Sequence, residues 1–427
     1  MERRPFYINF ILKLKRPEVN RNTAEKLSNA AQTKHNKSLV LRSVWNHSAM
    51  SRLEISRISG LSTATVSRIV DSLIQDELLV ESQPLAAPKG RPMKPVSFNG
   101  KGHYLIGIDL GTTYIRGVLT NLSIEPIKEI EVVTESNKDP EYVLNKVAQV
   151  IMNLANTNLV DPNNIIGVGI AVAGIINLNT GIVEYSPAFN WRNVELREFM
   201  NSHVPYPVYF DNVSRAMALG EITFGNGPGF DDLICINVGY GIGAGIVIGK
   251  KLFYGTDGMA GEFGHMPVRG DEQVFCTCGK KNCLTAYASG DAIAQRARIG
   301  LLSNSSSILN KIPAGELNAK QVVEAARQGD PLAKEVFSEA MGYLGRAIAG
   351  LLNIFNPQAI ILAGGVSLNG NIFWDTLKPV IEENVFDHRS TKYNILPSSH
   401  PDQSAIYGAL AMVLQEILNL SLTIRKQ

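Results

Sequence analysis

The 427-residue sequence predicts an α/β fold in which an N-terminal winged helix-turn-helix precedes a two-lobed α/β domain. Three observations support this prediction. Three short helical segments and a basic, Pro- and Gly-containing loop occupy residues 38–100. Beyond residue 100, a buried strand that leads into a glycine turn occurs three times, and residues 258–289 hold three of the four cysteines. The length is sufficient for two or three domains.

The domain boundaries expected from these patterns divide the chain into four parts. An N-terminal arm covers residues 1–37, and the winged helix-turn-helix covers 38–100. The first lobe covers 101–225 and the second 226–427, with the last helix returning to the first lobe. The arm is basic and partly apolar, and it either orders on contact with a partner or is a frayed chain end.

Charge and hydrophobicity limit the classes of function. The net charge is +2 and the sequence pI is about 8.2, so affinity for nucleic acid must come from a local basic region rather than from the whole surface. No apolar run is long enough to cross a bilayer, and the apolar stretch near the start lacks the length and cleavage site of a signal peptide. We therefore expect a soluble, cytoplasmic protein.

The helical segments after Lys37 match a helix-turn-helix. The second segment opens with Ser51 and Glu54, which form a capping-box pattern, and ends at Gly60. The third starts at Ser62, a good N-cap, and repeats apolar residues at helical spacing. A packing module of three helices is the alternative. In a helix-turn-helix the third segment enters the major groove of DNA, and the side chains expected to face bases and phosphates are Thr63, Ala64, Thr65, Ser67 and Arg68.

The loop that follows predicts a wing. Residues 81–99 combine Pro and Gly with Lys89, Arg91 and Lys94. Arg91 stands between a glycine and a proline, and a guanidinium on such a loop can enter a narrow minor groove, where the negative potential is strongest. A basic linker between domains is the alternative.

The glycine turns of the larger domain predict a ligand-binding fold. A strand over Tyr104–Ile108 leads into Asp109–Thr113, and a second strand returns. Backbone amides of such a turn can surround a phosphate, although an ordinary hairpin has the same pattern. The theme recurs at Gly239–Gly245 and at Gly364–Gly365. Two related α/β halves with glycine turns indicate a two-lobed fold for a nucleotide or a sugar.

The cysteine-rich stretch predicts a zinc site. His265, Cys276, Cys278 and Cys283 supply one imidazole and three thiolates, a complete tetrahedral shell for Zn²⁺. A disulfide would leave an odd thiol, because the only other cysteine is the isolated Cys235. A chance cluster of reduced cysteines is the alternative.

Glu262 lies three residues before the proposed metal ligand His265. A carboxylate can accept hydrogen bonds from vicinal hydroxyl groups, and a metal-bound imidazole keeps its second nitrogen for a ligand. The pair therefore predicts a site for a hydroxylated ligand, with an ordinary surface glutamate as the alternative.

Residues 103–418, with the run GHMPV…CTCGKKNC, resemble the ROK family of sugar kinases and sugar-responsive repressors. That resemblance implies an actin-like, ribonuclease-H-like two-lobed fold. Together with the winged helix, the chain resembles the repressor branch, which includes xylose, N-acetylglucosamine and glucose-regulon repressors. It implies that the zinc ligands are the four residues given above, and that Asn212, Glu262 and His265 contact the sugar.

The sequence departs from the kinases of this family at positions that matter for catalysis. The aspartate that serves them as base for the sugar hydroxyl corresponds to Val213, which cannot accept a proton. Asp211 is a replacement only if the register shifts. Tyr240 stands in a phosphate turn that usually has a small hydroxyl residue, and Thr285 replaces a glutamate on the sugar side, where it can still hydrogen-bond a hydroxyl. We therefore assign no catalytic residue.

These observations predict a repressor rather than an enzyme. We expect a homodimer or homotetramer that binds a double-stranded DNA operator of carbohydrate genes and carries a structural Zn²⁺. A degenerate kinase-like domain would sense a sugar inducer. The alternatives are an active ATP-dependent sugar kinase with an appended DNA-binding domain, and a repressor whose signal is a protein partner.

Overall fold

The computed structural model describes residues 29–47, 49–83, 94–268, 274–303, 306–386 and 393–419. The first 28 residues of the predicted arm lie outside these ranges, and so do Lys89 and Arg91 of the predicted wing.

The N-terminal unit contains three helices and a two-stranded sheet. The helices are α1 (Asn29–His47), α2 (Arg52–Ser59) and α3 (Thr63–Gln75), and β1 (Leu79–Glu81) pairs antiparallel with β2 (Val96–Phe98). Ser51 and Glu54 form the predicted capping box, and Gly60 ends α2 in the left-handed conformation with φ of 71°. The predicted local signals of the helix-turn-helix are confirmed.

The start of α1 corrects the predicted boundary between arm and winged helix. The helix begins at Asn29, so the boundary at residues 37 and 38 falls inside it. Val40, Leu41 and Val44 are fully buried and anchor the C-terminal half. The N-terminal half is largely exposed, and an exposed helical turn needs no apolar stripe, so the hydrophobic pattern did not reveal it.

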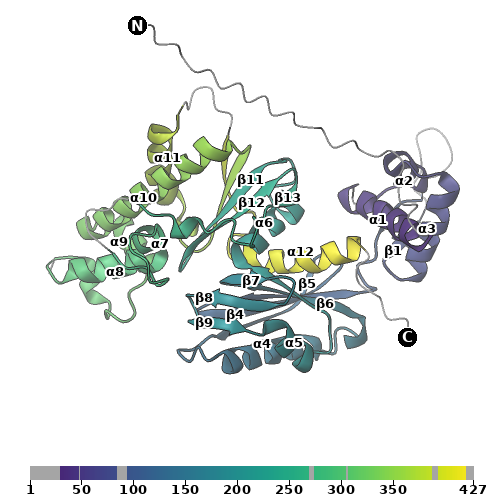
Figure 1. Cartoon of the computed structure of the whole chain (residues 1–427), viewed down its shortest axis with the longest axis horizontal. Helices are drawn as coiled ribbons and strands as arrows, with labels where there is room; N and C mark the ends of the chain where they lie inside the picture. Colours follow the sequence, from purple (N-terminus) through teal and green to yellow (C-terminus); the bar gives the residue numbers. More distant parts are fainter. Residues whose placement is uncertain are drawn as a thin grey trace, which may run out of the picture.

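The first lobe is built on a five-stranded sheet with the order β10-β6-β3-β4-β5. Its helices α4 and α5 lie on the outer side of this sheet, as Figure 1 shows. A three-stranded sheet, β7-β8-β9, adjoins it. The elements are β3 (Tyr104–Leu110), β4 (Tyr114–Asn121), β5 (Pro126–Val133), α4 (Pro140–Ala155), β6 (Ile165–Val172), β7 (Ile175–Asn177), β8 (Ile182–Ser186), β9 (Trp191–Val194), α5 (Leu196–His203) and β10 (Val208–Asn212).

The second lobe repeats this plan. Its sheet has the order β13-β12-β11-β14-β15, in which β11 and β12 form an antiparallel hairpin and β14 runs parallel to β11, as β6 does to β3. The elements are β11 (Leu233–Val238), β12 (Ile242–Ile248), β13 (Lys251–Leu252), α7 (Thr285–Ala288), α8 (Gly290–Leu301), α9 (Ala319–Arg327), α10 (Pro331–Phe355), β14 (Ala359–Ala363), α11 (Asn371–Asn384) and β15 (Asn394–Pro397).

Two helices join the lobes. Helix α6 (Val213–Phe224) packs on β11 and β12 of the second lobe, whereas α12 (Ser404–Leu418) packs on β3 and β6 of the first and against α6. Figure 1 shows α12 crossing between the two sheets and ending at the winged helix. The two helices approach closely because both carry glycine: a Cβ on Gly408 would lie 2.0 Å from the Ala216 carbonyl oxygen.

Candidate metal and ligand site

The four predicted metal ligands come together in the second lobe. His265 belongs to the 3₁₀ turn η2 (Phe263–His265), and the cysteines lie on the loop before α7. Their donor atoms all lie within 4.8 Å of one another. The Cys278 and Cys283 sulfurs are 3.7 Å apart, and the Cys276 sulfur is 3.8 Å from His265 Nδ1. Sulfurs bound at about 2.3 Å to a tetrahedral Zn²⁺ are separated by about 3.8 Å, so this cluster can hold a metal ion.

Local hydrogen bonds fix the loop that carries the cysteines. Asn282 adopts a left-handed backbone with φ of 61°, and its side-chain oxygen accepts hydrogen bonds from the Val274 amide and the Tyr287 hydroxyl. Cys283 pairs with Pro267 through an isolated β-bridge. The sulfur atoms are therefore positioned by the fold itself.

Glu262 lies near the ring nitrogen of His265 that does not face the cysteine sulfurs. Its Oε2 atom is 3.9 Å from His265 Nε2, and both side chains are 31% exposed. The ring thus presents Nδ1 to the sulfurs and Nε2 to the carboxylate. Gly261 allows this arrangement, because a Cβ there would lie 1.9 Å from the Ala244 carbonyl oxygen. A ligand that reaches Glu262 therefore lies next to the group of four predicted metal ligands.

Thr285 adjoins the same turn. A Cβ on Gly264 would lie 2.4 Å from Thr285 Oγ1, so this hydroxyl faces the backbone between Glu262 and His265. The hydroxyl is buried and has no hydrogen-bond partner among the described residues. Buried polar atoms are nearly always paired, so this hydroxyl is available to hydrogen-bond a ligand. The structure brings Thr285, Glu262 and His265 together.

Asn212 has a largely structural role. Its side-chain oxygen caps α6 by accepting from the amides of Ser214 and Arg215, at 2.8 and 3.4 Å, and its Nδ2 donates to the Gly174 carbonyl at 2.9 Å. One Nδ2 hydrogen remains for a ligand. The sequence did not reveal the bond to Gly174, because Gly174 lies 38 residues away.

The structure removes Asp211 as a replacement base. Its Oδ1 accepts from Arg215 Nε at 2.7 Å and from the Asn212 amide at 2.6 Å, and its Oδ2 accepts from the Tyr254 hydroxyl at 3.1 Å. The Asp211 side chain is 4% exposed and that of Arg215 is 1% exposed. Burial, then the Asp211 charge, raises the pKa of Tyr254, so the phenol keeps its proton and donates it to the carboxylate. A carboxylate occupied in this way is not free to take a proton from a sugar.

Sequence reasoning missed Arg215 and Ser186. Arg215 Nη1 donates to the Gly258 carbonyl at 2.7 Å, while its Nη2 has no partner among the described residues. The Ser186 hydroxyl is also buried and unpaired, and its Cβ would lie 2.9 Å from a Cβ on Gly174, the partner of Asn212. The only signal in the sequence is one arginine in the otherwise apolar helical stretch VSRAMALG.

The predicted phosphate turn of the first lobe is a hairpin tied to its neighbours. The carbonyls of Gly111 and Thr112 accept hydrogen bonds from the Thr134 hydroxyl at 2.8 Å and from Lys138 Nζ at 2.7 Å. The Tyr240 side chain in the second-lobe turn is 52% exposed. Binding of phosphate at these turns stays a prediction.

The predicted DNA-facing residues lie on the outer side of α3. Val66, Ile69, Val70 and Leu73 form its buried face. On the opposite side, Thr63, Ala64 and Arg68 are exposed, and Thr65 and Ser67 are half-buried. Arg52 of α2 forms an ion pair with Asp71 of α3 at 2.7 Å, and this pair helps to hold the two helices together.

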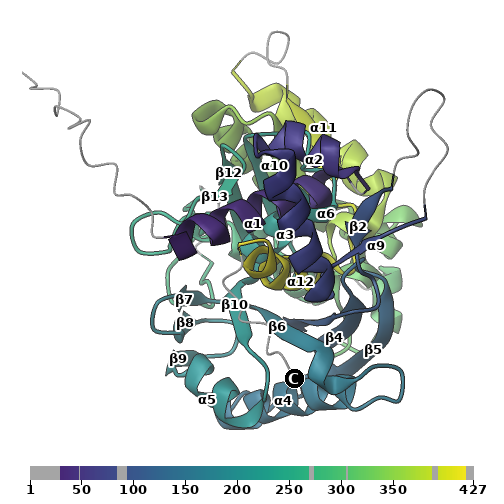
Figure 2. The same ribbon diagram turned by 90° about the vertical axis from the view of Figure 1, so that its right-hand side faces the viewer.

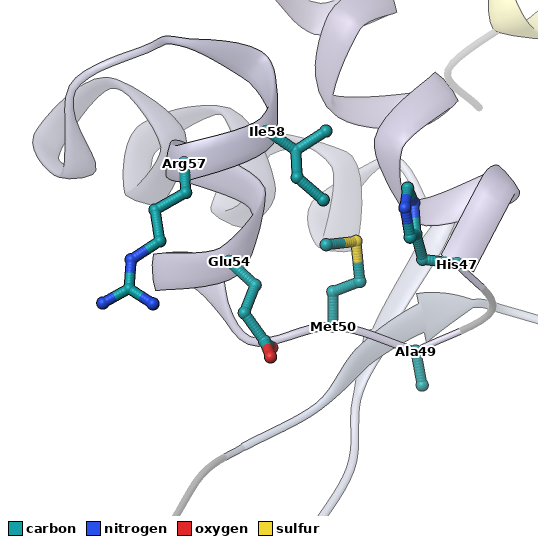
Figure 3. A pocket seen from close by; sticks show the side chains of 6 residues that line it. All are labelled: His47, Ala49, Met50, Glu54, Arg57 and Ile58. Atoms are coloured by element: carbon teal, nitrogen blue, oxygen red, sulfur yellow. The ribbon is translucent and has the colours of Figure 1, made fainter.

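A hollow of about 330 Å³ lies between α1 and α2 (Figure 3). Met50 points into it, and Glu54, which also lines it, is already engaged in the capping box with Ser51. The hollow belongs to the winged helix, so it is distinct from the Glu262 site.

A family model described as "ROK family" matches residues 105–416. The chain belongs to the ROK family. It is 34% identical over 388 residues to the xylose repressor of Caldicellulosiruptor bescii, which covers 90% of this chain and 96% of that one. It is 32% identical over 316 residues to the glucokinase of Thermotoga maritima, covering 73% of this chain and 98% of that one.

Among solved structures, a ROK family transcriptional regulator described as a homologue of the E.coli MLC protein matches with a TM-score of 0.78 and 27% identity. The match covers 91% of this chain and 97% of the other. The predicted fold, an N-terminal DNA-binding unit followed by an actin-like ROK domain, is confirmed. Among the described helices, none has the length and apolar character needed to cross a bilayer.

Proposed function

We propose that this ROK protein is a DNA-binding repressor of carbohydrate-utilisation genes. The observation that carries the proposal is a polar, outward-facing side of α3, joined to a kinase-like domain in which Val213 stands at the position of the catalytic base and the nearby Asp211 is paired with Arg215. The similarity to a protein named xylose repressor supports it. A repressor of this kind works in the bacterial cytoplasm, where operator DNA lies.

On DNA, α3 is the recognition helix of a homodimer or homotetramer. Two copies of α3 in a symmetric assembly read a two-fold related operator whose half-sites are separated by whole helical turns. The side chains proposed to contact bases and phosphates are Thr63, Ala64, Thr65, Ser67 and Arg68, and Arg91, outside the described residues, is the residue proposed for the minor groove.

The inducer is a neutral sugar, held by Glu262, His265, Thr285 and the remaining Nδ2 hydrogen of Asn212. The charges support this choice. Glu262 is negative, and the charge of Asp211 is offset by Arg215. His265 is one of the four proposed metal ligands. A sugar phosphate would bring about two more negative charges at pH 7 next to the negative Glu262. Xylose is the first candidate, given the name of the relative.

The metal is a structural Zn²⁺ bound by His265, Cys276, Cys278 and Cys283. When bound, it cross-links the loops that carry Glu262 and Thr285, and all four tetrahedral positions are filled by protein. The residues themselves orient the ligand: His265 presents Nε2, and Glu262 accepts hydroxyl hydrogens.

The test is operator binding measured by fluorescence anisotropy, with xylose, glucose and their phosphates titrated in. We expect a neutral sugar to lower the affinity for DNA and the phosphates to have no effect. A second candidate, an active sugar kinase, is favoured by the glucokinase relative. ATP-dependent phosphorylation of the sugar by the purified protein would support that candidate. If no sugar alters operator binding, a protein partner becomes the better signal.

A further inference from the structure

We propose that helix α6 transmits sugar binding from the Glu262 site to the winged helix through a contact between Phe224 and Trp45. This inference rests on the proposed function, because it assumes that a sugar at Glu262 controls DNA binding. The two ends of α6 touch the two sites, and nothing in the sequence pattern connects them.

At its N-terminal end, α6 is tied to the loop that carries Glu262. Arg215, in the first turn, donates to the carbonyl of Gly258, four residues before Glu262, at 2.7 Å. Arg215 is held in turn by Asp211 at the end of β10. A sugar that draws the Glu262 loop toward the first lobe therefore acts on the first turn of α6.

At its C-terminal end, α6 touches the winged helix. Phe224 is its last residue, and the Phe224 ring meets the ring of Trp45 in α1 edge-on, with centroids 5.8 Å apart. Trp45 also packs edge-on against Phe98 in β2 at 5.5 Å. The Phe224 ring further contacts Tyr407 in α12 at 5.9 Å. Phe224, at the end of one joining helix, thus contacts both the DNA-binding unit and the other joining helix, α12.

The helix between these ends moves as one body. Its 12 residues extend about 18 Å, and its backbone hydrogen bonds prevent it from bending without cost. Glu221, near the C-terminal end, is buried, and its carboxylate accepts hydrogen bonds from the Ser398 hydroxyl and the Ser399 amide. A displacement of the first turn of α6 therefore also displaces Phe224 and the loop before α12.

The winged helix rests on the same pair of helices. Figures 1 and 2 show the three-helix unit at the end of α12. Val40, Leu41 and Val44 of α1 share one buried cluster with Ile417 and Leu418 of α12, and Arg42 hydrogen-bonds Asn419. The same cluster includes Leu105 of β3 and Val118 of β4, so the winged helix also packs on the first lobe. Helix α6 is the joining helix that contacts both the Glu262 loop, through Arg215, and the winged helix, through Phe224.

The proposal requires two arrangements of the protein, one that binds operator DNA and one that releases it. A sugar shifts the equilibrium between them only by its different affinity for each. An edge-on aromatic pair changes an equilibrium by a factor of about 2 to 13 beyond its buried area. Removing the Phe224 ring should therefore weaken the link between the sites by a similar factor, while it leaves each site intact.

The test compares Phe224→Leu with the matched control Phe199→Leu. Phe199 is also an aromatic residue, but its ring stacks on His203 within α5 of the first lobe. For each protein, sugar affinity is measured by calorimetry and operator affinity by anisotropy, with and without sugar. For Phe224→Leu we expect unchanged sugar affinity in the absence of DNA, and a loss of operator affinity on sugar addition that is smaller than in wild type by a factor of about 2 to 13. The control should behave as wild type.

Wild-type release of DNA by Phe224→Leu would overturn the inference, while the proposed function would stand. A wild-type protein that binds sugar but keeps its DNA would instead overturn the proposed function. Should Phe224→Leu fold poorly by circular dichroism, Trp45→Leu removes the same ring–ring contact from the other side, with the same expected result. Hydrogen exchange in α1 gives an independent readout: sugar should change it in wild type and change it less in the variant.

Discussion

The buried pair of Asp211 and Arg215 gives the sharpest test of the site geometry. Replacing Arg215 by Met keeps much of its volume but leaves the Asp211 carboxylate buried without a countercharge. Breaking a buried ion pair by removing one partner costs about 3–5 kcal/mol. Tyr254 and the Asn212 amide still donate to the carboxylate, so we expect the lower end, a loss of about 3 kcal/mol in the free energy of unfolding.

The measurement is urea unfolding of the zinc-loaded protein followed by circular dichroism. The double variant Asp211→Asn/Arg215→Met removes the charge together with its partner, and it should recover about half or more of the lost stability. Lys250→Met is the matched control, because Lys250 and Asp231 form a pair at 3.4 Å that is 62% and 65% exposed. Its effect should be within about 0.5 kcal/mol. A loss below about 1 kcal/mol for Arg215→Met, or a double variant as unstable as the single one, would refute the argument.

Four further outcomes are expected. Cys278→Ser should lose bound zinc by elemental analysis and the response to sugar with it, and zinc-free wild-type protein that still responds would contradict this. Arg68→Ala should weaken operator binding by about 1–3 kcal/mol in a gel shift, without altering zinc content. Glu262→Ala should bind operator and zinc but no longer release DNA when sugar is added; release at the wild-type sugar concentration would place the signal elsewhere. Burial raises the pKa of Asp109 from 3.8 to about 6, so this carboxyl group lowers the stability of the fold progressively between these two pH values and by its full amount above pH 6. Asp109→Asn should therefore stabilise the protein at pH 7–8 by less than about 3 kcal/mol, since Asp109 is half-buried, and give little gain near pH 4; equal gains at both pH values would contradict this.

Charge and spacing in the sequence were enough to predict features that depend on near neighbours. The α2 capping box needs only Ser51 and Glu54, and the turn after it needs only Gly60. The metal cluster needs four donors within 19 consecutive residues, and the loop between His265 and Cys283 is short enough to bring them together. Strands and helices of the lobes followed from hydrophobic periodicity, which reports local burial.

The tertiary structure decided which polar groups are free to act. Whether Asp211 is a base depends on Arg215 and Tyr254, and Tyr254 lies 43 residues away in the other lobe. The side-chain oxygen of Asn212 is occupied by the cap of α6, and one of its Nδ2 hydrogens is occupied by the distant Gly174 carbonyl. The link between Phe224 and Trp45 likewise joins residues that no sequence pattern relates. A side chain's type and spacing predict what it can bond, but its available hydrogens and lone pairs depend on partners that only folding brings within reach.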